Sequence, residues 1–113
     1  MTLNEYQELA GATADYPDMG GNLLYPAIGC GEEAGEILGK VKKLWRNLGI
    51  TSGSLLSQDQ KDAIEKEIGD NLWYLQQMCT ELGITLEHAA QTNIDKLYDR
   101  KARGVIKSEG DNR

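Results

Sequence analysis

Two groups of acidic residues, each inside a long stretch of helical periodicity, constrain this chain more than any other feature. Glu32, Glu33 and Glu36 form the first group, and Glu67 and Asp70 form the second. Side chains three or four residues apart lie on one face of a helix, so each group gathers its carboxylates on one side. Like charges this close repel one another and weaken a helix. Two such groups on facing helices would be stabilised by a cation between them.

Apolar residues recur at helical spacing over most of the chain, and no stretch of useful length alternates as a strand would. Thr2, Ser57 and Thr85 are suited to cap helix N-termini, and Gly49 is suited to end a helix. We expect four helices, over residues 3–14, 25–48, 58–82 and 86–102. This pattern predicts an all-α fold, a four-helix bundle.

The length of 113 residues fits one domain. We assign residues 1–104 to this domain and residues 105–113 to a polar C-terminal tail, which we expect to be frayed. The polar N-terminus is not a signal peptide, and no apolar run approaches the roughly 18 residues that a membrane span needs. We therefore expect no membrane partner and a cytoplasmic location.

The charge balance bears on the kind of ligand. The net charge is −6, from 12 basic and 18 acidic residues, which argues against a general nucleic-acid-binding surface. A nucleotide ligand stays open, because one phosphate site needs only a few local cations or a bound metal. Cys30 and Cys79 are not in a C-x-x-C pair and the chain has one histidine, so nothing indicates a zinc site or a disulfide framework.

The acidic groups have two interpretations, a solvated helix face and a metal site. Small residues surround the first group, at Gly31, Ala34 and Gly35, instead of the usual mixture of lysine and glutamate. The second group lies beside the apolar stripe that contains Ile68 and Leu72. Burying these acids without a cation would cost several kcal/mol each. The pair of motifs therefore favours a site for a hard divalent cation such as Mg²⁺.

Four glycines lie inside the second expected helix, at positions 29, 31, 35 and 39. Each costs about 0.5–1 kcal/mol of helix stability relative to alanine. So many in one helix suggest close approach, and close approach by another helix and by a ligand are equally good interpretations.

Three motifs follow one another along the chain: Glu32-Glu33-x-x-Glu36, Glu67-x-x-Asp70 and Asn93-x-x-Lys96-x-x-x-Arg100. In this combination they resemble the MazG-like members of the all-α nucleoside triphosphate pyrophosphohydrolases. The resemblance extends to residues 3–7, 24–27 and 42–43 and spans most of the chain up to Gly104. One departure is the long interval between Glu36 and Glu67, whose extra residues fall in the loop 51–57. That loop could alter access to the site or contacts between subunits.

The resemblance implies hydrolysis of a (deoxy)nucleoside triphosphate to the monophosphate and pyrophosphate. It implies that Mg²⁺, with Mn²⁺ able to substitute, is held by four carboxylates: Glu33, Glu36, Glu67 and Asp70. The metal would activate a water for attack on the α-phosphorus. Glu32 is a candidate either to orient or deprotonate this water or to add a metal ligand, and these roles stay open.

The third motif supplies donors for phosphate. Asn93, Lys96 and Arg100 lie one turn apart and form a stripe on the fourth helix. Arg suits bidentate contacts with phosphate and Lys supplies a point charge. Tyr98 lies beside this donor stripe and is a candidate for a sugar or base contact. The two tryptophans could stack on a base as well, although such aromatics are most often core or interface residues.

One chain of this size offers little surface to enclose a nucleotide, so we expect a homodimer or a homotetramer built on the long helices. Two alternatives remain at this stage. One is a non-catalytic helical interaction module whose acids are only a solvated face. The other is a dUTPase-like, dCTPase-like or phosphoribosyl-ATP hydrolase-like member of the same superfamily.

Overall fold

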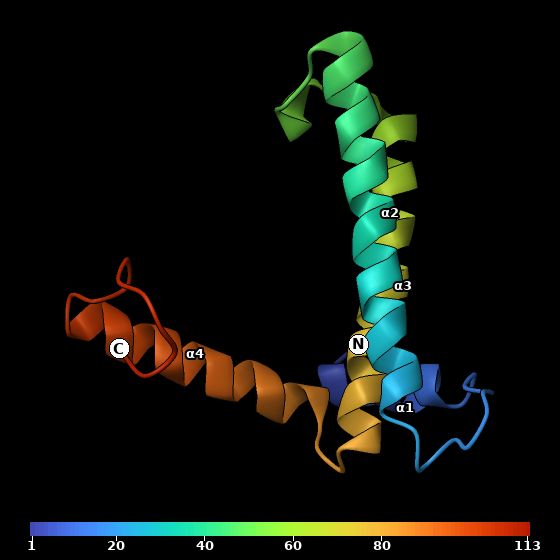
Figure 1. Ribbon diagram of the computed structural model, residues 1–113, viewed down its shortest axis with the longest axis vertical. Coiled ribbons are helices and arrows are strands. Elements are labelled where there is room, and N and C mark those ends of the chain that lie inside the picture. The colour runs from blue at the N-terminus through green and yellow to red at the C-terminus, as the bar shows by residue number, and fades with distance from the viewer.

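The computed structural model describes residues 1–113 and contains four α-helices and no strand (Figure 1). The helices are α1 (Leu3–Gly11), α2 (Leu24–Leu48), α3 (Gln58–Glu81) and α4 (Leu86–Ala102), with a short 3₁₀-helix, η1 (Gly53–Leu55), between α2 and α3. The predicted all-α class is confirmed. The bounds of the three longer helices differ from the predicted ones by at most one residue at either end.

Local capping explains why these bounds follow from the sequence. Thr2 and Ser57 each form a capping box with the residue three positions later. The Thr85 hydroxyl accepts the backbone N–H of His88 at 3.0 Å. Gly49 ends α2 in a left-handed conformation, with φ of 67°, which glycine adopts without steric cost.

Helix α1 ends at Gly11, so the prediction that it reaches residue 14 was wrong. The Thr13 hydroxyl donates to the carbonyl of Ala10 at 2.7 Å, and the indole N–H of Trp73 donates to the same carbonyl at 3.2 Å. The backbone N–H of Thr13 also donates to this carbonyl at 3.0 Å, so the last turn is tightened and the two side chains add to it. The chain then leaves α1 in a loop that runs to Leu23.

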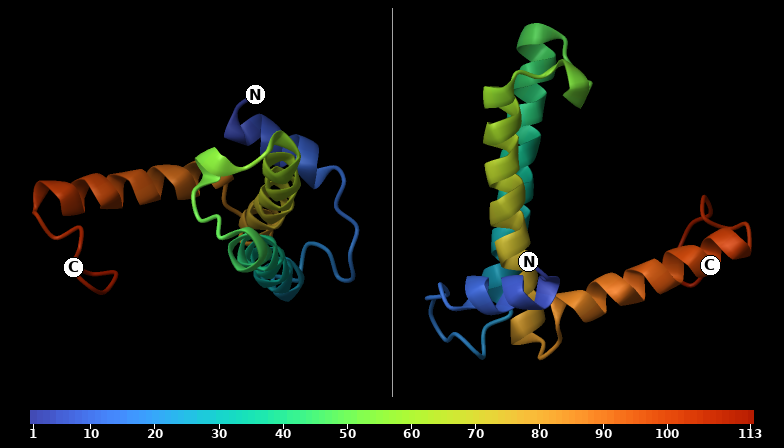
Figure 2. Two further views of the ribbon diagram at one scale, coloured as in Figure 1. Left: turned by 90° about the horizontal axis from the view of Figure 1, so that it is seen from above. Right: turned by 180° about the vertical axis from the view of Figure 1, so that it is seen from behind.

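Helices α2 and α3 form a long antiparallel pair, and α1 packs across the end of α3 (Figures 1 and 2). The loop 49–57 lies at the opposite end of this pair, away from α1. Helix α4 extends to the side of the pair and contacts α1 and α3 only near its own start (Figure 2). The four predicted helices are present, but within one chain α4 does not lie along the other three.

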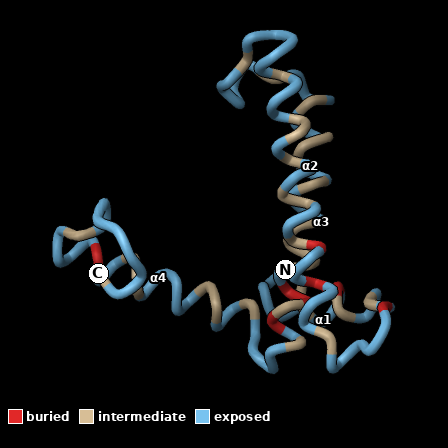
Figure 3. The backbone as a smooth tube through the Cα atoms, in the orientation of Figure 1, coloured by how far each residue is buried: buried red, intermediate tan, exposed pale blue.

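The buried core is small and lies where α1, the start of α2 and the end of α3 meet (Figure 3). Only 8 of 113 residues are buried. Along the rest of the helix pair, large apolar side chains remain exposed, including Leu38, Trp45 and Ile68. A single chain therefore leaves much of the apolar surface of its two longest helices in water.

The glycines of α2 differ in what surrounds them. A Cβ atom added at Gly29 would lie 2.2 Å from the ring of Tyr74, so glycine is needed for this ring to pack on α2. Nothing lies within 4 Å of the corresponding position at Gly31, Gly35 or Gly39. Close approach by another helix is thus confirmed at one of the four positions.

The C-terminal tail folds back on α4, so the prediction of a frayed tail was wrong. The Arg100 guanidinium donates to the backbone carbonyl of Asp111 at 2.8 Å, and Arg103 donates to the backbone carbonyl of Arg113. These contacts hold the tail because they satisfy two cations at the end of the helix. None of the four helices combines the length and hydropathy needed to cross a membrane.

Candidate active site

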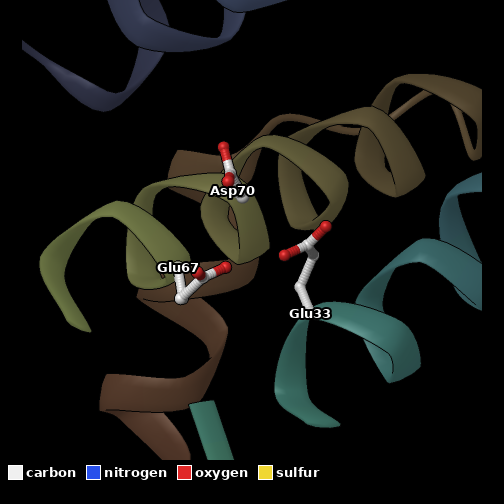
Figure 4. Close-up of side chains that lie close together, drawn as sticks. All are labelled: Glu33, Glu67 and Asp70. Carbon is white, nitrogen blue, oxygen red and sulfur yellow. The ribbon is translucent and has the colours of Figure 1, made fainter. Parts of the chain in front are cut away.

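Three of the predicted acidic residues come together between the two long helices. Glu33 projects from α2, and Glu67 and Asp70 project from neighbouring turns of α3 (Figure 4). Each offers a carboxylate oxygen, and the three oxygens all lie within 4.8 Å of one another. We call these residues the carboxylate group. The three-residue spacing on α3 and the packing of α2 against α3 together create it.

The carboxylate group is electrostatically unfavourable by itself. The pKa of Glu33 is raised above its ordinary value, first by burial and then by the charges of Asp70 and Glu67. Glu33 and Glu67 are half-buried, whereas Asp70 is exposed. An oxygen-rich, negatively charged opening of this kind matches the donor set of a hard divalent cation.

Lys40 is a neighbour of the carboxylate group that the motifs did not single out. Its Nζ lies 3.2 Å from Oε1 of Glu67, across the gap between α2 and α3. The signal that could have found it is its position seven residues after Glu33, which puts both on one face of α2. Lys40 thus partly compensates the charge of one carboxylate.

Glu32 and Glu36 lie outside the carboxylate group. Both side chains are exposed on α2. Glu36 is one turn beyond Glu33, on the same helix. The charge of Glu32 contributes to the raised pKa of Glu33, after burial and the two acids of α3. The structure therefore brings together three of the four residues predicted to bind metal.

A pocket of about 330 Å³ opens beside the carboxylate group. Glu33 and Asp70 form one part of its lining, and Thr13, Trp73 and Tyr74 form the rest. We call it the aromatic pocket. The indole N–H of Trp73 donates to the Thr13 hydroxyl at 2.8 Å, which fixes the ring against the loop after α1. The sequence did not place Thr13 at the site, because nothing local indicates that this loop reaches α3.

Glu81, near the end of α3, holds the loop that carries Thr13. Its carboxylate accepts the backbone N–H groups of Gly20 at 2.9 Å and Asn22 at 3.2 Å, and the hydroxyl of Tyr16. These hydrogen bonds lower the pKa of Glu81, that of Tyr16 having the largest effect. Tyr16 also stacks on Tyr25 with a centroid separation of 4.6 Å. The loop is thereby fixed to both long helices.

The predicted donor stripe lies on α4, which points away from the pair of helices α2 and α3 that carries the carboxylate group (Figures 1 and 2). Lys96 Nζ and Arg100 Nη2 both contact Oδ1 of Asp111 in the tail, at 3.0 and 2.9 Å. Arg100 is buried, whereas Asn93 and Tyr98 are exposed. Within one chain, the donor stripe and the carboxylate group are therefore not brought together.

The sequence is similar to one protein family and to one phage protein. The family described as "MazG nucleotide pyrophosphohydrolase domain" matches residues 28–105. "Gene 37 protein" of Mycobacterium phage L5 is 39% identical over 118 residues, and the match covers 100% of both chains. No solved structure matches this chain significantly.

Proposed function

Because this chain belongs to the MazG nucleotide pyrophosphohydrolase family, we propose that it hydrolyses a (deoxy)nucleoside triphosphate with the help of Mg²⁺. The products would be the (deoxy)nucleoside monophosphate and pyrophosphate. The observation that carries the proposal is the convergence of Glu33, Glu67 and Asp70 to within 4.8 Å. Like charges this close destabilise a metal-free pair of helices, and a divalent cation bound between them would offset the repulsion and bring a polyphosphate with it.

The residues present fit a divalent metal. The donor set is made only of oxygens, and the raised pKa of Glu33 reflects burial first and then neighbouring negative charge, which a cation would offset. Mg²⁺ or Mn²⁺ bound here would polarise phosphate oxygens and lower the pKa of a bound water. We propose Glu36 as a further ligand, since it lies one turn from Glu33, and Glu32 as the residue that orients or deprotonates the water.

We also propose that the working form is a homodimer or a homotetramer. A second copy packed on α2 and α3 would cover apolar side chains such as Leu38, Trp45 and Ile68, which are exposed in one chain. It could also supply the donor stripe, because α4 of the same chain points away from the carboxylate group. Asn93, Lys96, Tyr98 and Arg100 would then bind the nucleotide across the interface.

A direct assay tests the proposal. The protein is incubated with each ribonucleoside and deoxyribonucleoside triphosphate and Mg²⁺, and pyrophosphate release is measured. Glu33→Gln and Asp70→Asn should each abolish release, while Glu65→Gln should not, because Glu65 is an exposed acid of α3 outside the carboxylate group. Release that survives both site substitutions would refute the assignment of the site.

The absence of release with every nucleotide, together with no Mg²⁺-dependent thermal shift, would favour the helical interaction module. The exposed apolar surface of α2 and α3 is the observation that would then need a partner. Release confined to dUTP, dCTP or phosphoribosyl-ATP would instead place the chain beside the corresponding specialised members of the superfamily.

A further inference from the structure

The carboxylate group has two chemically different neighbours along the helix pair. Trp73 follows Asp70 by three residues on α3, and Lys40 follows Glu33 by seven residues on α2. Because the two helices are antiparallel, these directions are opposite (Figure 1). Lys40 lies toward the loop 49–57 and Trp73 lies toward α1. The site therefore has an aromatic end and a cationic end.

The aromatic end is preformed. Trp73 is held by two hydrogen bonds from its indole N–H, to Ala10 and Thr13, and Tyr74 packs against it edge-on with a centroid separation of 5.1 Å. With its N–H already used, the indole offers the aromatic pocket its ring surface. The volume of about 330 Å³ lies at the small end of the range for small-molecule pockets. A fixed aromatic wall suits the flat surface of a nucleobase.

The cationic end suits phosphate. Lys40 already contacts a carboxylate oxygen, that of Glu67, at 3.2 Å. Lys40 and Lys43 also line a second hollow of about 410 Å³, whose other lining residues are the polar Asn47 and Gln60 and the apolar Leu44, Leu48, Ala63 and Ile64. Lysine ammonium groups bind phosphate as point charges. The aromatic pocket, in contrast, has no cationic side chain in its lining, and its two carboxylates are Glu33 and Asp70 of the carboxylate group, so it offers the outer phosphates no direct partner.

Building on the proposed function, we propose that the substrate lies along α2 and α3 in one direction, with its nucleoside in the aromatic pocket and its departing pyrophosphate beside Lys40. Hydrolysis joins a water oxygen to the α-phosphorus and breaks the bond to the oxygen that bridges the α- and β-phosphates. The electron pair of that bond leaves with pyrophosphate, and the proton lost by the water passes to solvent. The α-phosphate thus belongs at the carboxylate group, between the two ends.

The first test uses fluorescence. The chain has two tryptophans, so Trp45→Phe leaves Trp73 as the only reporter, and Trp45 is exposed on α2, away from the aromatic pocket. This variant is saturated with Mg²⁺ and titrated with each deoxynucleoside monophosphate and, separately, with inorganic pyrophosphate. We expect at least one monophosphate to quench Trp73 and pyrophosphate to leave its emission unchanged. Quenching by pyrophosphate alone, or equally by both, would overturn the orientation.

The second test uses calorimetry on substituted proteins. Lys40→Ala should weaken pyrophosphate binding about 10-fold and change monophosphate binding less than twofold. Trp73→Phe should do the reverse, because it narrows the stacking surface and removes the N–H. Lys66→Ala is the matched control, since Lys66 is exposed on α3 and has no ion-pair partner. Equal losses for both ligands in Lys40→Ala would overturn the proposal.

The two proposals fail in different ways. If no triphosphate is hydrolysed but the two ligands bind at opposite ends, the orientation stands and the proposed catalysis fails. If hydrolysis is intact but the ligand effects of Lys40→Ala and Trp73→Phe are exchanged, the orientation alone fails. If neither ligand binds at millimolar concentration with Mg²⁺, both proposals are overturned.

Discussion

Lys40 on α2 and Glu67 on α3 form an ion pair of 3.2 Å that joins the two long helices beside the carboxylate group. The Lys40 side chain is 37% exposed and that of Glu67 is 18% exposed, so water screens the pair only in part. The ammonium group therefore competes with any metal for Glu67, and it is also the nearest cation for a phosphate. Lys40 therefore weakens the binding of a metal ion and strengthens the binding of a phosphate.

This competition predicts the effect of Lys40→Ala on metal binding in the absence of nucleotide. We expect the variant to bind Mg²⁺ a few-fold more tightly than the unmodified protein, because one carboxylate loses its competing cation. Titration calorimetry with Mg²⁺ alone measures the change. Lys66→Ala serves as the control for net charge, and an unchanged or weaker affinity for Mg²⁺ in Lys40→Ala would contradict the interpretation.

The raised pKa of Glu33 predicts how stability depends on pH. A carboxyl whose folded-state pKa is raised contributes fully to stability below its unfolded pKa, and this contribution is lost as pH rises through the folded pKa. The metal-free protein should therefore lose stability as pH rises above the ordinary Glu value of 4.5. Glu33→Gln should reduce this loss and raise the Tm at pH 7 by a few °C, as followed by thermal denaturation.

Added Mg²⁺ should make the Tm of the unmodified protein higher than that of Glu33→Gln, which reverses the order expected without metal. The unmodified protein gains the free energy of metal binding, whereas Glu33→Gln lacks one ligand and gains less. Glu65→Gln, an exposed acid on α3, should respond like the unmodified protein in both conditions. A Tm of Glu33→Gln that rises with Mg²⁺ as much as that of the unmodified protein would argue against Glu33 as a ligand.

Local signals explain the part of the fold that the sequence predicted. Capping by Thr2, Ser57 and Thr85 depends on residues at most three positions away, so the starts of three helices followed directly. The motifs also led to the family that the comparison then confirmed. Carboxylates on one face of each helix needed only the helical repeat, and Glu33 meets Glu67 because α2 and α3 are consecutive and antiparallel.

Longer-range packing explains the features of the fold and of the site that the sequence did not predict. The rotation of α2 about its axis decides that Glu33 enters the carboxylate group while Glu36 stays exposed, and helical spacing alone does not distinguish them. The early end of α1 depends on Trp73, about 60 residues away along the chain. The direction of α4 depends on the short connection after Gly83, whose φ of 69° turns the chain away from the helix pair.

The contact between Gly29 and Tyr74 predicts opposite effects of alanine at two glycines of one helix. Gly29→Ala would put a Cβ 2.2 Å from an aromatic ring, and overpacking of this kind costs about 1–3 kcal/mol. Gly39→Ala meets nothing within 4 Å and should stabilise α2 by about 0.5–1 kcal/mol. Urea denaturation of both variants measures the difference. A destabilised Gly39→Ala would indicate that a second copy approaches α2 closely there.

The tail contact predicts that Asp111 competes with anionic ligands of the donor stripe. Arg100 first, and then Lys96, lower the pKa of Asp111, so the contact is intact above the ordinary Asp value of 3.8 and is lost as pH falls through the lowered value. At neutral pH, Asp111→Asn should remove the carboxylate charge that pairs with Lys96 and Arg100, while the hydrogen bond from Arg100 to the backbone carbonyl of residue 111 stays. If the donor stripe binds the triphosphate, the KM should fall a few-fold while kcat stays unchanged, because only a ground-state competitor is removed.

Glu109→Gln, an exposed acid of the same tail with no ion-pair partner, should leave the KM unchanged. An unchanged KM in Asp111→Asn would mean that the Lys96–Arg100 pair serves to fasten the tail and does not bind substrate.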